Sequence, residues 1–214
     1  MLKAILLLIL TATANWATTL LFQGVLPSDD TVEFIQFALS SDSVVTLQSY
    51  GYAGGTANST TIGGGGFAPF AVIFAVVGSD FVQALTDNGG HCGQTYSDPV
   101  TGNCDDPYIQ TPLPAGIYYL GLSVWDNVPS TGNLADGYAQ TGNPGFSCAE
   151  GGVSGQFCDV TDALFRSRTG NWAFAVSGVD SAIDITAPEP ATWGCFAVGL
   201  GSVLFLLRRK KIER

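Results

Sequence analysis

The sequence predicts an all-β protein, a single antiparallel β-sandwich that is jelly-roll-like and has about 7–9 strands. Three observations lead to this fold class. Short runs of β-branched and aromatic residues recur along the chain, 27 glycines among 214 residues supply turns, and no helical periodicity is evident between residues 17 and 187. Apolar residues make up 46% of the chain, enough for a core. A signal helix at the N-terminus and a transmembrane helix at the C-terminus are expected to flank this domain.

The expected strands lie at residues 32–39, 43–52, 70–77, 81–85, 116–125, 171–179 and 181–186. They are rich in Val, Ile, Phe and Tyr, which favour strands. The run 70–77 is apolar throughout, which predicts a central strand buried on both faces. Gly78 and Ser79 fit a two-residue type II′ hairpin turn. The glycine-rich stretch from residue 51 to 66 is expected to form a loop or a wide turn.

Residues 1–17 have the features of a signal peptide. Lys3 precedes an apolar stretch, residues 4–10, and small residues follow. Ala12-Thr13-Ala14 fits the small-x-small cleavage rule, and Ala17 offers a second exit point. The alternative is an N-terminal membrane anchor, but this apolar stretch is too short to span about 30 Å of hydrocarbon. The body of the chain is therefore expected to be exported.

The C-terminal segment, residues 187–214, has three parts in a fixed order. Pro188-Glu189-Pro190 comes first, residues 191–207 carry no charge, and Arg208, Arg209, Lys210 and Lys211 follow directly. Seventeen residues reach about 25 Å as a helix, the lower limit for a membrane span. The basic tail, 208–214, should remain cytoplasmic by the positive-inside rule, which leaves the body outside the membrane.

This order of tripeptide, apolar helix and basic tail resembles a PEP-CTERM sorting signal. The resemblance implies that an exosortase, an integral-membrane protease, processes the chain near Pro188-Glu189-Pro190. It also implies a Gram-negative bacterium that makes exopolysaccharide. The chain would then be an inner-membrane-anchored precursor that is later found at the cell surface or in the extracellular matrix, with extracellular polysaccharide as a candidate partner.

The body, residues 18–186, has a familiar order of features between residues 22 and 127. The most specific stretch is Leu113-Pro114-Ala115-Gly116-Ile117-Tyr118-Tyr119 after an aspartate-rich loop. This part resembles a bacterial pre-peptidase C-terminal domain, which implies a small β-sandwich. The segment from residue 133 to 162 fits that pattern poorly and is expected to be an inserted loop.

Four cysteines of the body fall in two loops. The local pairings Cys92–Cys104 and Cys148–Cys158 are favoured because each brackets a Gly/Asp-rich loop without apolar anchors, and an exported compartment permits disulfides. Zinc binding and free thiols are the alternatives. The cysteine spacings are not those of zinc sites, and His91 is the only histidine.

Seven aspartates gather in predicted turns: Asp29, Asp30, Asp87, Asp98, Asp105, Asp106 and Asp126. Calcium prefers six to eight oxygen ligands from flexible loops, so these residues are candidate Ca²⁺ ligands. Some pre-peptidase C-terminal domains bind calcium, which the resemblance adds without assigning ligands. The alternative is that aspartate simply favours turns and keeps an exported surface soluble. No other cofactor is indicated.

Nucleic acid is excluded as a partner by charge. Residues 15–187 contain 16 acidic residues against Arg166 and Arg168, a net charge of −14. No catalytic motif stands out, and a Ser-His-Asp set would have to use His91 beside Cys92. The sequence thus predicts a non-enzymatic exported protein of the cell surface or exopolysaccharide matrix. The alternatives are a calcium-dependent carbohydrate- or matrix-binding module and, less favoured, a secreted hydrolase.

Overall fold

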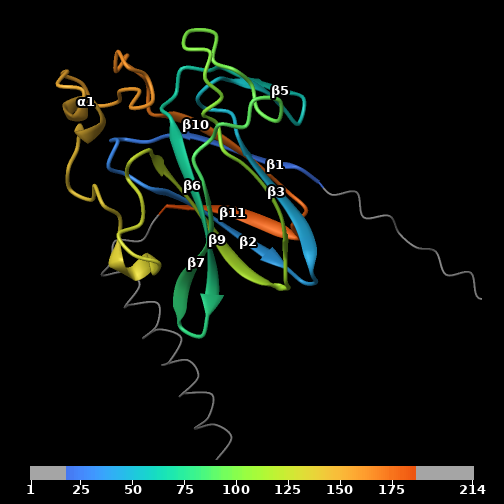
Figure 1. Ribbon diagram of the computed structural model, residues 1–214. Coiled ribbons are helices and arrows are strands. Elements are labelled where there is room, and N and C mark those ends of the chain that lie inside the picture. Colours follow the sequence, from blue (N-terminus) through green and yellow to red (C-terminus); the bar gives the residue numbers. More distant parts are fainter. Residues whose placement is uncertain (1–17, 187–214) are drawn as a thin grey trace, which may run out of the picture.

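A computed structural model describes residues 18–186 of the protein (Figure 1). Those residues are the predicted body. The predicted signal peptide, residues 1–17, and the predicted sorting signal, residues 187–214, lie outside the described residues. Within residues 18–186, no helix is long and apolar enough to cross a membrane.

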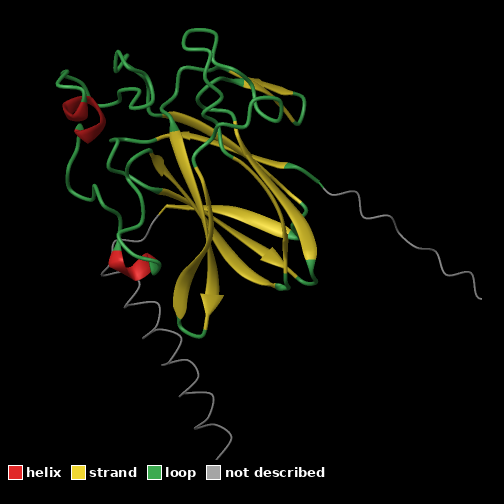
Figure 2. Ribbon diagram, viewed as in Figure 1, coloured by secondary structure: helices red, strands yellow, loops and turns green. Residues whose placement is uncertain are grey.

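The body consists of antiparallel strands in two main sheets (Figures 1 and 2). The four-stranded sheet has the order β1 (Leu20–Val25), β10 (Asn171–Ser177), β3 (Ser43–Ser49), β8 (Tyr108–Leu113). The five-stranded sheet has the order β11 (Ser181–Thr186), β2 (Glu33–Leu39), β9 (Gly116–Val124), β6 (Pro69–Val77), β7 (Asp80–Asp87). A separate hairpin pairs β4 (Gly55–Ala57) with β5 (Thr60–Ile62). The all-β prediction is confirmed.

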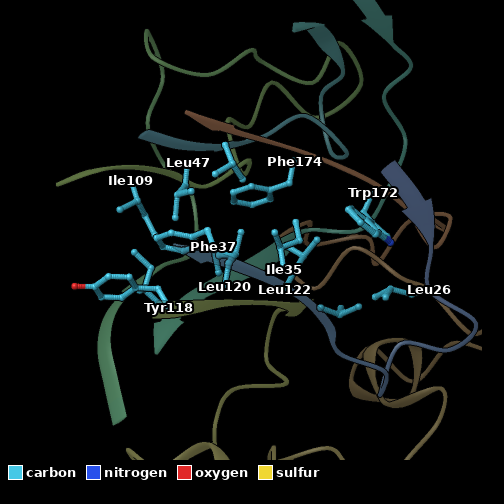
Figure 3. Close-up of a cluster of buried hydrophobic side chains, with 14 of the residues drawn as sticks. Leu26, Ile35, Phe37, Leu47, Ile109, Tyr118, Leu120, Leu122, Trp172 and Phe174 are labelled. Atoms are coloured by element: carbon cyan, nitrogen blue, oxygen red, sulfur yellow. The ribbon is translucent and has the colours of Figure 1, made fainter. Parts of the chain in front are cut away.

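The largest hydrophobic cluster is built from residues of both sheets (Figure 3). Alternate residues of β2, Ile35 and Phe37, belong to it, as do Leu47 of β3 and Phe174 of β10. Successive side chains of a strand point to opposite faces, so each sheet contributes one face to this cluster. Burial of these side chains away from water is the main stabilising term of the fold.

The outer faces of the sheets are covered as well. On the five-stranded sheet, Phe34, Val72 and Phe74 form a second buried cluster with Tyr138 from the long segment after β9. On the four-stranded sheet, Ala173 and Ala175 pack with residues of the β4–β5 hairpin. This double covering explains why β6 is buried from residue 69 to 74 without alternation. The prediction of burial on both faces over residues 70–77 is thus confirmed up to residue 74, whereas Val76 and Val77 are exposed.

The predicted strands are all present, with ends that shift by at most three residues. β6 and β7 are joined by Gly78 and Ser79, as expected, and Gly78 has the positive φ of 67° that a type II′ turn requires. Four strands were not anticipated: β1, β8 and the two short strands β4 and β5. The segment 133–162 contains no strand but two short helices, η1 (Leu134–Asp136) and α1 (Phe146–Glu150), drawn red in Figure 2.

The stretch from residue 51 to 66 is more ordered than its composition suggested, and the expectation of a loop was wrong here. It contains the β4–β5 hairpin, whose two turn residues, Asn58 and Ser59, both have positive φ (47° and 63°). This is the backbone of a type I′ turn, which suits the twist of a two-residue hairpin. The two strands have only three residues each and lie among glycines, so the sequence showed no strand pattern here.

Candidate functional site

Both predicted disulfides are formed. The Cα atoms of Cys92 and Cys104 are 5.2 Å apart, and those of Cys148 and Cys158 are 4.8 Å apart. These four sulfur atoms are therefore not thiols, which removes the zinc and free-thiol alternatives for them. Disulfides persist in oxidising compartments, so the pair of bonds points to an extracellular or periplasmic location.

A buried ionic cluster joins three loops. We call it the Arg168 cluster, and its members are Arg168, Asp98, Asp159, Tyr52 and Thr101. The Arg168 guanidinium donates hydrogen bonds to Asp98 (2.5 Å) and to Asp159 (2.9 Å from Nε and 2.5 Å from Nη2). It also lies over the Tyr52 ring, 4.2 Å from the centroid. The cluster therefore ties the loop after β3, the first disulfide loop and the segment before β10 together.

Hydrogen bonds satisfy the rest of the Arg168 cluster. The Tyr52 hydroxyl donates to Asp159 at 2.9 Å, and it lies 2.9 Å from the hydroxyl of Thr101. Thr101 in turn donates to Asp98 at 3.1 Å. The side chains of Arg168, Asp98 and Asp159 are only 6%, 3% and 0% exposed. Such shielded charges are tolerated only when they are paired and hydrogen-bonded.

Electrostatics in this cluster favour the ionised forms of Asp98 and Arg168 and the neutral form of Tyr52. Burial alone would raise the pKa of Asp98, but the hydrogen bond and charge of Arg168, with the Val100 amide and Thr101, lower it overall. Burial alone would lower the pKa of Arg168, yet Asp98 and Asp159 raise it. Desolvation raises the pKa of Tyr52, so its phenol stays neutral and can donate. The cluster therefore acts as a structural link between three loops, and none of these three groups has a pKa suited to proton transfer.

Two of the predicted calcium ligands, Asp29 and Asp30, anchor the inserted segment instead. Asp29 is fully buried and accepts hydrogen bonds from the amides of Gly145 (2.6 Å) and Ser147 (2.9 Å) and from the Ser147 hydroxyl (2.7 Å). Asp30 accepts from the Gly142 amide at 3.1 Å. These bonds tie the start of α1 to the loop that precedes β2.

Asp106 holds the loop that follows β3. It accepts hydrogen bonds from the Ser49 hydroxyl (2.6 Å) and from the amides of Tyr52 (3.1 Å) and Ala53 (2.9 Å). Its neighbour Asp105 accepts from the Thr161 hydroxyl at 2.5 Å. Desolvation raises the pKa of Asp106 even though these donors act in the opposite direction. Both aspartates therefore link loops that are distant in sequence.

The last two predicted ligands stand apart from these. Asp87, the last residue of β7, lies 2.6 Å from Nε2 of His91, just before the first disulfide loop. Asp126 is exposed at the end of β9. The structure brings Asp98, Asp105 and Asp106 into one loop, but each bonds to a different partner, and the other four aspartates are spread over three further places.

No group of three or more His, Cys, Asp or Glu side chains within residues 18–186 is arranged to hold a metal ion. The geometry of the candidate aspartates therefore lends no support to calcium binding, which stays a prediction. A comparison of melting curves in millimolar calcium and in chelator tests it, because a bound ion stabilises the folded state by mass action.

Sequence reasoning missed the residues that matter most here, Arg168, Asp159 and Tyr52. A signal was available for Arg168. It is one of only two basic residues in a body of net charge −14, so it was bound to attract carboxylates. The carboxylates that it meets lie 70 and 9 residues away in the chain, and no local pattern identifies them.

Most aromatic side chains of the loops anchor those loops to the body. Tyr52, Tyr138, Phe146 and Phe157 are all buried, whereas Tyr96 is 48% exposed. Phe146 and Phe157 extend the main core beneath the second disulfide. These rings therefore do not form an exposed stacking platform for sugars.

A carboxyl pair lies at the other side of the fold, next to the end of the described chain. Glu33 of β2 shares a face with Asp184 of β11, which lies opposite Ile35. Desolvation raises the pKa of Glu33 to about 7, and the hydrogen bond and charge of Asp184 act in the same direction. Oε1 of Glu33 is buried and has no hydrogen-bond partner within the described residues. A proton shared between the two carboxyl groups relieves their repulsion.

This pair makes stability depend on pH. Since the pKa of Glu33 rises from 4.5 in the unfolded chain to about 7 in the folded protein, its contribution is fully present below pH 4.5 and is lost as pH rises to about 7. We expect Glu33→Gln to remove this loss, so that the variant gains stability relative to wild type at pH 8 but not at pH 4.5. Urea unfolding at the two pH values measures the difference.

The matched control for Glu33 is Glu150→Gln, which changes an exposed carboxylate on α1 in the same way. We expect it to leave the pH dependence of unfolding as in the wild type. Equal pH dependence for Glu33→Gln and the wild type would show that Glu33 is ionised normally in the folded protein.

The chain matches no protein-family model and no curated protein sequence. The class that the fold itself defines is an acidic, disulfide-bonded, antiparallel β-protein with two main sheets.

Proposed function

We propose that the chain is a non-enzymatic exported protein of the bacterial cell surface or exopolysaccharide matrix, sorted by its C-terminal signal and processed by an exosortase. The observation that carries this proposal is the order of three parts in residues 187–214: Pro188-Glu189-Pro190, an uncharged stretch of 17 residues, and a basic tail. An N-terminal stretch with the features of a signal peptide is consistent with it. Membrane contact is expected only for the precursor, through residues 191–207.

The described body supports both parts of this proposal, export and a non-enzymatic role. Its two disulfides fit an oxidising compartment. Its buried charges, in the Arg168 cluster and at Asp29 and Asp106, are all engaged in holding loops, so the geometry supports a stable carrier or matrix domain better than an active site. His91, the one histidine, is paired with Asp87, and the structure brings no serine or cysteine nucleophile to it by a hydrogen bond within residues 18–186.

We propose further that the body is a jelly-roll-like sandwich, similar to a pre-peptidase C-terminal domain. The orders β1-β10-β3-β8 and β2-β9-β6-β7 support this, because the chain passes from one sheet to the other at most connections. In addition, β1 and β10, which are the first and last strands of the four-stranded sheet along the chain, pair with each other. β11 adds an edge strand beside β2.

Intact-mass analysis of the protein from its native host tests the sorting proposal. We expect the mature species to lack Leu207 and everything after it. Glu189→Ala should accumulate as a precursor that retains the tail, because the tripeptide is disrupted. Glu150→Ala, a matched change in the body, should be processed like the wild type. A mature wild-type species that still carries residues 207–214 would contradict the proposal.

A further inference from the structure

β11 is the last strand of the body and the outermost strand of the five-stranded sheet (Figure 1). Within residues 18–186 it pairs with β2 alone, from Ser181 opposite Ala38 to Thr186 opposite Glu33. None of the side chains of residues 181–185 is buried. A strand with few buried side chains opens locally at a lower free energy than a core strand does. β11 is therefore expected to detach more readily than the strands of the core.

Charged residues are almost absent from the strands of the sandwich. The strands of the four-stranded sheet, β1, β10, β3 and β8, contain none, and neither do β6 and β9. β7 has aspartates only at its two ends. β2 and β11 contain one charged residue each, Glu33 and Asp184. These two acidic residues therefore stand out, because they lie on adjoining strands.

The register places Glu33 and Asp184 on the same face of the sheet. Thr186 pairs with Glu33, and Asp184 pairs with Ile35, so the two acidic side chains are diagonal neighbours. On the other side of β2, the residue opposite Glu33 is Leu122 of β9, which has no charge. The two arginines of the body, Arg166 and Arg168, are both paired with aspartates of the loops. No cation of the described body therefore offsets the two carboxyl groups.

This arrangement makes the attachment of β11 depend on pH. One shared proton lets Glu33 and Asp184 lie together, whereas two carboxylates repel each other across the strands. Burial and the neighbouring Asp184 raise the pKa of Glu33 from 4.5 to about 7. When β11 detaches, Glu33 loses this neighbour and its pKa falls back towards 4.5. The attachment is therefore strongest below pH 4.5 and weakens as the pH rises to about 7.

β11 also directly precedes the segment on which the sorting proposal depends. The strand ends at Thr186, and Pro188-Glu189-Pro190 begins two residues later. A protease binds its substrate as an extended segment of several residues, and residues that are paired in a sheet cannot enter its active site. Cleavage of a folded protein then follows the population of the locally opened form. Detachment of β11 would supply the extended segment before Pro188.

We propose that β11 is a pH-controlled latch on the processing site. While Glu33 and Asp184 share a proton, β11 stays attached to β2 and the region around Pro188 is held close to the sandwich. Loss of that proton detaches β11 and makes the region accessible to the protease. The inference rests on the proposed function, because it assigns a regulation to the processing step. It predicts that the precursor is processed faster near and above neutral pH than in acid.

Hydrogen exchange of the full-length protein in detergent micelles, followed by mass spectrometry, tests the latch. The wild type is compared with Glu33→Gln at the same pH, so that the intrinsic pH dependence of exchange cancels. The amide stays neutral and keeps β11 attached. At pH 8 we expect residues 181–186 to exchange at least about tenfold faster in the wild type than in the variant, and at pH 4.5 at similar rates. β10 should exchange equally in both proteins.

Two further variants complete the test. Asp184→Asn, a change at an exposed position, should also slow the exchange of β11 at pH 8. Glu150→Gln, the matched control on α1, should exchange like the wild type at both pH values. In the native host grown at pH 8, Glu33→Gln should accumulate more precursor than the wild type, and Glu150→Gln should not.

Equal exchange of β11 in the wild type and in Glu33→Gln at pH 8 would overturn the latch, and so would unchanged processing of Glu33→Gln in the host. The exchange result is obtained on the purified chain, so it does not depend on the protease. A mature wild-type species that keeps residues 207–214 would contradict the sorting proposal by itself. The two failures are therefore distinguishable.

Discussion

Replacing Arg168 with methionine is expected to lower the free energy of unfolding by about 3–5 kcal/mol, the usual cost of breaking a buried ion pair from one side. The substitution keeps much of the aliphatic stem but leaves Asp98 and Asp159 without their cation. Both carboxylates are almost inaccessible, so water cannot replace the lost hydrogen bonds. Urea unfolding at neutral pH, monitored by tryptophan fluorescence, measures the loss.

Arg166→Met is the matched control, because Arg166 pairs with Asp162 at 2.7 Å while its own side chain is 41% exposed. Exposed pairs contribute about 0–1 kcal/mol, so this variant should stay close to the wild type. Adding Asp98→Asn and Asp159→Asn to Arg168→Met should recover part of the lost stability, since amides carry no uncompensated charge. Equal destabilisation by Arg166→Met and Arg168→Met would show that the Arg168 cluster contributes no more to stability than an exposed ion pair.

Removing the disulfide between Cys148 and Cys158 is expected to cost about 3 kcal/mol by the loss of a cross-link that closes a loop of about ten residues. The double variant Cys148→Ala and Cys158→Ala also loses packing, because both cysteines are buried beside Gly155. Thermal and urea unfolding of the variant against the oxidised wild type give the difference.

The double variant Cys92→Ala and Cys104→Ala serves as the comparison. Its loop is similar in length, with a sequence separation of 12 against 10, so the chain-entropy cost should be nearly equal. Cys92 is exposed, however, so we expect the Cys148–Cys158 variant to be the less stable of the two. Unfolding curves for both double variants that coincide with the wild type would contradict a stabilising role for the bonds.

The strands were predictable because their signal is local. β-Branched and aromatic runs such as that of β6, bounded by glycine and polar turns, identify strands without knowledge of their partners. β1 was missed because its sequence adjoins the predicted signal peptide, and β8 because it follows directly on the first disulfide loop. β4 and β5 are too short for a pattern to form, and their pairing depends on a turn at Asn58 and Ser59 that lacks the usual glycine.

The candidate calcium ligands show the opposite case. The turns that contain Asp29, Asp98 and Asp106 were recognisable, but a turn aspartate can bind an ion, face water or accept hydrogen bonds from another loop. The structure shows the third role for these three residues. The donors from other loops lie between 53 and 118 residues away in the chain, so the choice depends on how the loops pack.

Local chemistry in the sequence thus determined the all-β class, most strands and both disulfide pairings. A strand run is recognisable from its own residues, and two cysteines close in sequence can pair without knowledge of the rest of the fold. The tertiary structure alone decided that Arg168 lies between Asp98 and Asp159 and that Glu33 faces Asp184. Each of these depends on groups from separate strands or loops meeting in space. Such a meeting follows from the packing of the two sheets, and no single segment encodes it.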